Sequence, residues 1–364
     1  MKLERLWLTD FRSYESAELV PAPEGLTVIV GANGQGKTNL LEAVGWLATL
    51  ASLRGAPNEA LVRVGAERAV VRAEGEREGR KLLLEAEVPA RGGRVRVQVN
   101  RQPLGRSREL LGALRVSVFS PDDLELVKGG PDGRRRLLDD ALASVGARYG
   151  ALQDDLARVL KQRGALLKGL ERGRLDESAA LTLDVFDARL ATVGAAAASA
   201  RRNLVARLAP AAAAAYDRLA GRPSAVAVAY EAAWGDGEAD LAAALAAARG
   251  DDVRRGVSTV GPHRDELGLS IGGLAARTHA SQGEQRTLAL ALRLAVHEVV
   301  TDVAGSAPIL LLDDVFSELD PARTAALVAS LPGGQALLTT AGDIPPGIAA
   351  AATVRVEGGR LQPS

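Results

Sequence analysis

The sequence predicts an α/β fold in which a mixed β-sheet carries a phosphate-binding loop and an α-helical arm is inserted into the chain. Three observations support this prediction. A β-branched run at 26–30 ends in a glycine-rich loop, and a helical pattern begins at Thr38. The wholly apolar run at 309–312 is typical of a strand that is buried on both faces of a parallel sheet. Between these regions, apolar residues recur at helical spacing from 149 to 219.

The composition is that of a globular protein. Of the 364 residues, 47% are hydrophobic and 25% are charged, which excludes wholesale disorder. The absence of cysteine excludes disulfides, thiolate metal sites, iron–sulfur clusters and cysteine nucleophiles. No apolar run approaches the roughly 18 residues of a membrane span, and residues 1–5 lack the apolar core of an export signal. We therefore expect a cytoplasmic protein with no membrane partner.

Charge is distributed unevenly along the chain, although its 45 basic and 45 acidic side chains give no formal net charge. Residues 52–108 hold 13 basic and 7 acidic side chains, whereas residues 231–343 hold 8 and 16. Nearly all of the basic side chains are arginines, which bind phosphate groups in a bidentate manner. Two interpretations stay open: the basic region faces a polyanion, or the arginines lie on an ordinary solvated surface.

The first 120 residues are expected to be rich in strands. Apolar residues alternate around Trp7, and the run at 26–30 predicts the strand before the glycine-rich loop. Residues 60–104 alternate apolar and charged in short bursts, which predicts a small antiparallel sheet. Residues 116–119 predict one more strand.

The middle of the chain predicts two antiparallel helices, because apolar residues recur at helical spacing over 149–170 and again over 186–208. The first helix spans about 22 residues, or ~33 Å, which is too short for an extended coiled coil. After residue 250, alternation at 267–271 predicts a strand, and a helix is expected to follow Ser281.

These elements predict a discontinuous head and an inserted arm. The head is expected to consist of residues 1–125, which hold the phosphate loop, and residues 251–364, which hold the segment at Ser281 and the apolar strand. The helical arm is expected at residues 126–250, between the two parts of the head.

The glycine-rich loop fits the pattern of a nucleoside-triphosphate site. It consists of Gly31, Ala32, Asn33, Gly34, Gln35, Gly36, Lys37 and Thr38. Its glycines let backbone N–H groups wrap a phosphate at the positive end of the following helix. Lys37 is expected to bridge the β- and γ-phosphates of ATP, and the Thr38 hydroxyl to bind Mg²⁺. The alternative is a glycine-rich turn without a ligand, and the glycine order argues against NAD.

Two carboxylates follow the apolar strand. Asp313 and Asp314 stand where the C-terminal ends of parallel strands meet the ligand of an α/β sheet. We expect Asp313 to bind Mg²⁺ through water and Asp314 to orient the attacking water, so that Asp314 and Lys37 are the catalytic candidates. The alternative is a pair of strand-end caps.

Residues 281–286 read Ser-Gln-Gly-Glu-Gln-Arg and open a helix. Ser281 and Glu284 form the pattern of a capping box. A second interpretation is compatible with the first: a serine hydroxyl and free N–H groups at a helix start bind anions. Ser281, Gln282 and Gly283 would then cover the γ-phosphate bound by another subunit.

Two further groups of residues have open interpretations. Arg134, Arg135 and Arg136 open a helix, and they either contact phosphate or form a solvated face. The three histidines are isolated from one another, which favours core or surface positions over metal binding.

These motifs resemble the head of the ABC/SMC ATPase superfamily. The resemblance rests on the phosphate loop, on residues 281–286 just before the Asp313–Asp314 strand, and on Ser-Glu-Leu-Asp at 317–320. Within the superfamily the whole chain resembles the RecF family. Segments specific to that resemblance are Asp-Phe-Arg-Ser-Tyr at 10–14, the run 119–127, the three arginines at 134–136 and Gly-Pro-His-Arg-Asp at 261–265. Thr339 and Thr340 stand where related ATPases place a switch histidine.

The resemblance implies an ATP-dependent homodimer that holds two nucleotides with Mg²⁺ between its subunits. It also implies binding to duplex DNA and to gaps and junctions, partnership with RecR and RecO, and loading of RecA during recombinational repair, replication-fork maintenance and the SOS response. ATP hydrolysis is expected to be slow, to be stimulated by DNA and to act as a switch.

Two alternative functions stay open, a transporter ATPase subunit and a chromosome-organising SMC-like head. The 243 positions that separate Thr38 from Ser281 are far more than a transporter subunit needs and far fewer than an SMC coiled coil occupies.

Overall fold

The computed structural model describes residues 2–105, 110, 112–170, 175–317, 319–342 and 344–363. The chain forms two compact units. The first unit comprises Met1–Asp123, Ala215–Pro223 and Ala289–Ser364, and the second comprises Leu124–Ala214 and Ser224–Leu288. Residues 251–288 therefore group with the helical second unit. A functional division at 1–125, 126–250 and 251–364 stays a prediction.

A mixed six-stranded sheet forms the centre of the first unit, as the sequence predicts. Its strand order is β15-β14-β3-β13-β12-β8, and all neighbours pair in parallel except β14 with β15. The strands are β3 (Gly25–Val30), β8 (Val116–Phe119), β12 (Ile309–Asp313), β13 (Gln335–Thr340), β14 (Ala350–Glu357) and β15 (Arg360–Pro363). The apolar strand β12 is buried between β13 and β8, which explains its unbroken run of large aliphatic residues.

A second sheet in the first unit is antiparallel. Its order is β2-β1-β4-β5-β6-β7, and its strands are β1 (Lys2–Phe11), β2 (Tyr14–Leu19), β4 (Arg68–Arg77), β5 (Arg80–Pro89), β6 (Arg96–Val99) and β7 (Gln102–Pro103). The antiparallel pairing predicted for 60–104 is confirmed in β4, β5, β6 and β7, and the sheet is larger than predicted because β4 also pairs with β1. In β4, every second residue is buried, as expected for a sheet that packs on the core with one face and faces solvent with the other.

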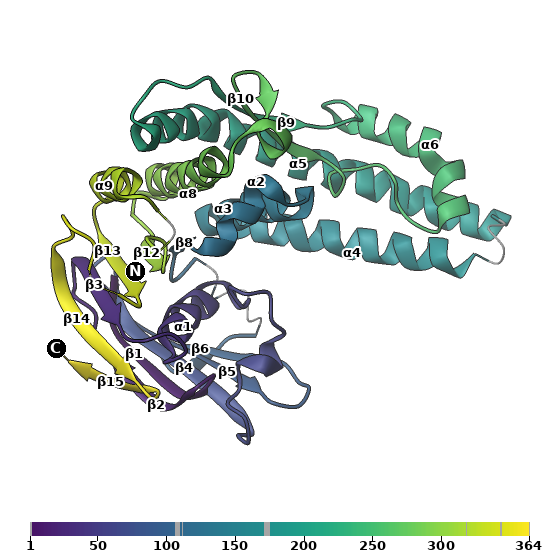
Figure 1. The fold of residues 1–364 in the computed structure, drawn as a ribbon. Coiled ribbons are helices and arrows are strands. Elements are labelled where there is room, and N and C mark those ends of the chain that lie inside the picture. The colour runs from purple at the N-terminus through teal and green to yellow at the C-terminus, as the bar shows by residue number, and fades with distance from the viewer. Residues whose placement is uncertain are drawn as a thin grey trace. The chain divides into compact units, whose positions relative to one another are not determined.

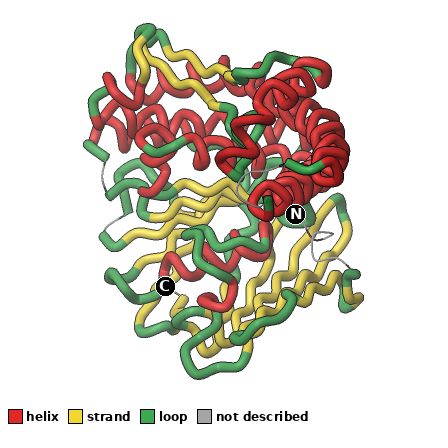
Figure 2. The backbone as a smooth tube through the Cα atoms, turned by 90° about the vertical axis from the view of Figure 1, so that its right-hand side faces the viewer, coloured by secondary structure: helices red, strands yellow, loops and turns green. Residues whose placement is uncertain are grey.

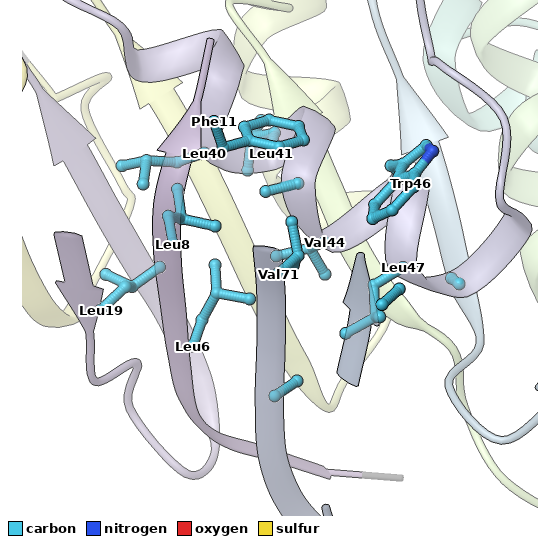
Figure 3. Close-up of a cluster of buried hydrophobic side chains, with 14 of the residues drawn as sticks. Leu6, Leu8, Phe11, Leu19, Leu40, Leu41, Val44, Trp46, Leu47 and Val71 are labelled. Carbon is cyan, nitrogen blue, oxygen red and sulfur yellow. The ribbon is translucent and has the colours of Figure 1, made fainter. Parts of the chain in front are cut away.

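Helix α1 (Lys37–Thr49) packs between these two sheets (Figure 1). Figure 3 shows Leu40, Leu41 and Val44 of this helix among leucines of the antiparallel sheet. The sequence predicts one apolar face on α1, but Trp46 and Ala43 are buried as well. The physical reason is that a helix between two sheets is covered on both sides.

Shorter elements and helix ends complete the first unit. These are the 3-10 turns Asn58–Leu61 and Pro121–Leu124, the C-terminal part of α8 (Gln282–Ala304) and α9 (Pro321–Ser330). The buried amide of Gln335 joins the start of β13 to β1: Gln335 Oε1 accepts from Leu3 N at 2.8 Å, and Gln335 Nε2 donates to Leu3 O at 2.7 Å.

Helices make up most of the second unit (Figure 2). They are α2 (Glu125–Lys128), α3 (Pro131–Val145), α4 (Ala147–Gly169), α5 (Glu177–Ala220), α6 (Glu238–Arg255), α7 (Ala276–His279) and the start of α8. A small antiparallel sheet accompanies them, formed by β9 (Val226–Glu231), β10 (Glu266–Ile271) and β11 (Leu274–Ala275). Helix α5 is longer than the 186–208 pattern predicts, and Pro210 lies inside it. No described helix is long and apolar enough to cross a membrane.

An ionic cluster is buried between helices α4, α5 and α6 of the second unit. The guanidinium of Arg163 is fully buried and donates to Asp187 Oδ1 and Ser258 Oγ at 2.7 and 2.8 Å. Its Nη1 also lies 2.7 Å from Asp252 Oδ2. Buried charges are tolerated when they are paired in this way, so the cluster fixes how the arm helices pack.

Candidate nucleotide-binding site

The glycine-rich loop connects β3 to α1 at the C-terminal edge of the mixed sheet. Gly34 and Gly36 have φ values of 79° and 110°, a region that side chains with Cβ disfavour. A Cβ on Gly31 would lie 2.4 Å from the carbonyl oxygen of Val356, so only glycine fits beside β14. The loop therefore has the close backbone approach that a phosphate cradle needs.

Neighbouring turns hold the loop from two sides. Gln35 Oε1 accepts a hydrogen bond from Gly358 N at 2.7 Å, at the turn between β14 and β15. On the other side, the Tyr14 hydroxyl donates to Gly36 O at 3.0 Å. Tyr14 belongs to the 10–14 segment, whose structural role was not predicted from sequence. The role of the C-terminal turn could not be found from sequence, because no pattern links positions so far apart.

Lys37 begins α1 and bends back over the loop. Its Nζ donates to Gly31 O at 2.7 Å and to Ala32 O at 2.9 Å. Burial lowers the pKa of Lys37, and the nearby carboxylates of Asp314 and Asp313 oppose that shift. The ammonium group therefore lies at the mouth of the loop, where it can exchange carbonyl partners for phosphate oxygens.

Oxygen atoms from three elements converge beside the loop. Asp313 ends β12, and its Oδ1 accepts from Thr38 Oγ1 at 2.9 Å and from Thr339 Oγ1 at 2.7 Å. Because the Thr38 hydrogen points to Asp313, the lone pairs of its oxygen stay free for a cation. Hydroxyl and carboxylate oxygens are the donors that Mg²⁺ prefers, so these residues fit that ion.

Asp314 has an unusual backbone conformation. Its φ is 49°, which is uncommon for a residue other than glycine, although aspartate tolerates it. Its N–H is shared between Thr339 Oγ1 at 3.0 Å and Thr339 O at 3.3 Å. The sharp turn directs the chain away from the sheet immediately after Asp313. Functional sites are common places for such conformations.

The segment after this turn connects Asp314 to α9. Ser317 Oγ donates to Asp314 O at 2.8 Å, and Asp320 caps α9 by accepting from Arg323 N at 2.8 Å. Glu318, which belongs to the motif at 317–320, lies outside the described residues.

Ser281, Gln282 and Gly283 lie in the second unit, whereas the phosphate loop, Asp313 and Asp314 lie in the first. The predicted capping box is confirmed: Ser281 N donates to Glu284 Oε2 at 2.9 Å, and Glu284 N donates to Ser281 Oγ at 3.4 Å. The buried Gln285 side chain donates to Ala276 O and Arg277 O, both at 3.1 Å. The sequence did not predict this anchoring role of Gln285, which fixes the start of α8 against α7.

The phosphate-contact interpretation is wrong for Arg134. Its buried guanidinium forms a bidentate pair with Glu266, with N–O distances of 2.7 and 2.8 Å, and its Nη1 donates to two backbone carbonyls. Arg135 donates to the carbonyl of Asp265 at 2.6 Å. Only Arg136 of the three is exposed. Two of these arginines therefore stabilise the second unit.

The Gly-Pro-His-Arg-Asp segment at 261–265 is anchored inside the second unit. Pro262 O accepts from Arg201 at 2.7 Å. The Asp265 carboxylate accepts from Tyr230 at 2.5 Å and from Trp234 at 2.9 Å, and burial raises the pKa of Asp265. These contacts give the segment a packing role in the second unit.

The histidines differ in their surroundings. His263 Nε2 lies 3.1 Å from Ser258 O. His297 in α8 is buried, neither ring nitrogen has a hydrogen-bond partner among the described residues, and burial lowers its pKa to about 4. His279 is exposed. Within the described residues, no group of three or more acidic or histidine side chains is arranged to hold a metal ion.

Comparison with known proteins relates the whole chain to one family. The family model described as RecF/RecN/SMC N terminal domain matches residues 2–336. A protein of Streptomyces avermitilis named DNA replication and repair protein RecF is 43% identical over 376 residues, which cover 100% of both chains. A protein of the same name from Frankia alni is 46% identical over 368 residues and 95% of both chains.

Solved structures agree with this relationship. The structure described as the recombination mediator protein RecF with ATP in the RecFOR pathway superposes with a TM-score of 0.91. It is 28% identical, and the match covers 100% of this chain and 97% of that one. A Smc head bound to the C-winged helix domain of ScpA superposes with a TM-score of 0.59 at 18% identity, over 100% of this chain and 96% of that one. That second similarity shows the fold alone.

Proposed function

Since this chain belongs to the RecF family of the ABC/SMC ATPase superfamily, we propose that it is an ATP-binding protein of DNA replication and repair. The observation that carries the proposal is the arrangement of Lys37 and Thr38 at the start of α1, with Asp313 in hydrogen-bond contact with Thr38. A lysine, a hydroxyl and a carboxylate at one glycine-rich loop are the groups that bind a nucleoside triphosphate and its Mg²⁺.

The residues of the loop divide the work of binding ATP. Backbone N–H groups at 31–36 and the N-terminal end of α1 receive the phosphates, and Lys37 replaces its bonds to Gly31 O and Ala32 O by bonds to phosphate oxygens. Thr38 and Asp313 would hold Mg²⁺, which when bound neutralises phosphate charge. Asp314 orients the attacking water, and slow hydrolysis followed by release of ADP and phosphate returns the protein to its unliganded state.

The γ-phosphate is covered by the partner subunit in this proposal. Ser281 and Gln282 are exposed at the start of α8, where the hydroxyl and helix N–H groups can receive an anion. As the family resemblance implies, ATP bound by one chain would be covered by residues 281–283 of a second chain. ATP would then drive formation of a homodimer.

DNA is the proposed macromolecular ligand. The relatives carry names of DNA replication and repair. The structure adds exposed arginines beside the last strands of the antiparallel sheet: Arg91 and Arg94 lie in the loop between β5 and β6, and Arg101 lies in the turn between β6 and β7. Arg96 of β6 is exposed as well and lies 3.5 Å from Glu87. No acidic residue occurs in the sequence from 90 to 103. Arginines of this kind bind the phosphates of duplex DNA without reading its sequence.

The wider pathway follows from the family. We propose that the ATP-bound dimer acts in the cytoplasm at gaps and single-strand/double-strand junctions. There it would work with RecR and RecO to load RecA in recombinational repair, at replication forks and in the SOS response. ATP hydrolysis is a weak, DNA-stimulated switch that releases the dimer.

Light scattering on a sizing column tests the proposal. The protein is run with ATP, ADP or no nucleotide, with and without gapped duplex DNA. A dimer that requires ATP and co-elutes with DNA supports the proposal, and Lys37→Met should abolish it. Lys161→Met, on an exposed face of α4, is the control. A monomer under all conditions would contradict the role of residues 281–283, and an ATPase indifferent to DNA would favour a transporter-type function.

A further inference from the structure

Thr339 lies between the two carboxylate residues of the site. It is 1% exposed at the C-terminal end of β13. Its Oγ1 lies 2.7 Å from Asp313 Oδ1 and 3.0 Å from Asp314 N. A hydroxyl has one hydrogen to donate and lone pairs to accept, so both bonds form at once: Thr339 donates to the Asp313 carboxylate and accepts from the Asp314 N–H.

Both contacts act on groups that chemistry at this site would need. The bond to Asp313 Oδ1 fixes the rotation of the carboxylate that faces Thr38. The bond from Asp314 N stabilises a left-handed backbone conformation that is uncommon for residues other than glycine. One hydroxyl therefore couples the direction of the Asp313 side chain to the backbone turn that places Asp314.

We propose that Thr339 is a positioning residue that joins the metal-binding carboxylate to the water-orienting one. The inference rests on the proposed function, since it assigns Thr339 to the same nucleotide and Mg²⁺ site. Thr339 contacts neither ATP nor Mg²⁺ in this proposal and acts through Asp313 and Asp314. This role requires the hydroxyl of residue 339, and a side chain of the same size without a hydroxyl is not sufficient.

The next residue provides a matched control. Thr340 also lies on β13 and is 9% exposed. Among the described residues its hydroxyl contacts Gly342 locally, at 3.4 Å to the carbonyl oxygen and 3.3 Å to the nitrogen. Replacement of Thr340 by valine removes a buried hydroxyl from the same strand without disturbing Asp313 or Asp314.

The experiment compares Thr339→Val, Thr339→Ser and Thr340→Val. Two quantities are measured for each: the gain in ATP affinity that Mg²⁺ produces, by titration with and without EDTA, and the rate of ATP turnover. Removal of a hydrogen-bond partner behind a metal ligand typically costs 10–100-fold. We therefore expect Thr339→Val to lose about tenfold or more of both quantities. Thr339→Ser and Thr340→Val should stay near wild type.

Each outcome decides between the two proposals. ATP affinity in EDTA should be equal in all variants, and equal affinity also shows that the variants are folded. If Thr339→Val does not fold, Thr339→Ala takes its place. If wild type gains affinity with Mg²⁺ and Thr339→Val gains as much as Thr340→Val, the role of Thr339 is overturned while the proposed function stands. If wild type does not bind ATP, the proposed function fails and the inference fails with it.

Discussion

The side-chain carbonyl of Gln35 accepts a hydrogen bond from the backbone N–H of Gly358, at 2.7 Å and across 323 positions of the sequence. Gln35 lies in the phosphate loop, and Gly358 lies in the turn between the last two strands. In the same region, β14 pairs in parallel with β3, and Val356 O packs directly against Gly31. The C-terminal hairpin therefore packs against the glycine-rich loop of the proposed nucleotide site.

Replacement of Gln35 by alanine should weaken ATP binding without unfolding the protein. One hydrogen bond that holds the loop contributes about 0.5–1.5 kcal/mol, so we expect a loss of about 2–10-fold in ATP affinity. Titration with ATP measures the effect, and Gln102→Ala on β7 is an exposed control. Unchanged affinity in Gln35→Ala would mean that the loop keeps its shape without the C-terminal turn.

Replacement of Asp314 by asparagine should separate ATP binding from hydrolysis. Asparagine tolerates positive φ about as well as aspartate, so the turn at 49° should be retained. The variant loses the charge that orients water, and we expect turnover to fall about 10²–10⁴-fold while ATP affinity changes less than about twofold. A single-turnover assay with a binding titration makes the comparison. Wild-type turnover in Asp314→Asn would exclude Asp314 from the reaction.

Replacement of Ser281 by arginine should block the ATP-dependent dimer and spare ATP binding by the monomer, since the loop lies in the other unit. The variant also loses the cap of α8, which costs about 0.5–2 kcal/mol. Glu284→Ala removes the glutamate half of the same capping box without placing bulk at position 281. Light scattering with ATP should show a dimer for Glu284→Ala and a monomer for Ser281→Arg. A dimer in both would rule out the role of Ser281 in trans.

The buried His297 should make the protein less stable in acid. Its pKa is about 4 in the folded protein, whereas an unfolded chain has a histidine pKa of about 6.5. Between these values the unfolded chain binds a proton that the folded protein does not, so the free energy of unfolding falls as pH drops from 6.5 to 4. The full loss is about 3 kcal/mol.

Urea denaturation at pH 7 and pH 5 measures this effect. His297→Leu should remove the part of the pH dependence of the free energy of unfolding that the His297 ring causes. His279→Leu, at an exposed position, should retain that pH dependence. An equal pH dependence in wild type and His297→Leu would show that another group is responsible.

Local sequence patterns predicted the elements of the site well. The strand–loop–helix around Lys37, the buried strand before Asp313 and the capped helix start at Ser281 all follow from spacing within about ten residues. Patterns of this kind are local because a strand, a turn and a helix cap are each formed by neighbours in the chain. The extent of the antiparallel sheet was not predicted, because pairing between distant strands leaves no such local pattern. Helix α5 was predicted too short, since it begins at Glu177, before the first residue of the 186–208 pattern.

The sequence by itself determined the fold class, the nucleotide loop and the family resemblance, because each depends on short motifs with fixed backbone requirements. Only the tertiary structure decided the partners of individual side chains. It showed that Arg134 forms an ion pair with Glu266 and that Thr339 forms hydrogen bonds with both Asp313 and Asp314. It also showed that the C-terminal turn donates a hydrogen bond to Gln35. The physical reason is that hydrogen bonds and ion pairs reach only about 3 Å, so their partners are chosen by packing across the whole chain.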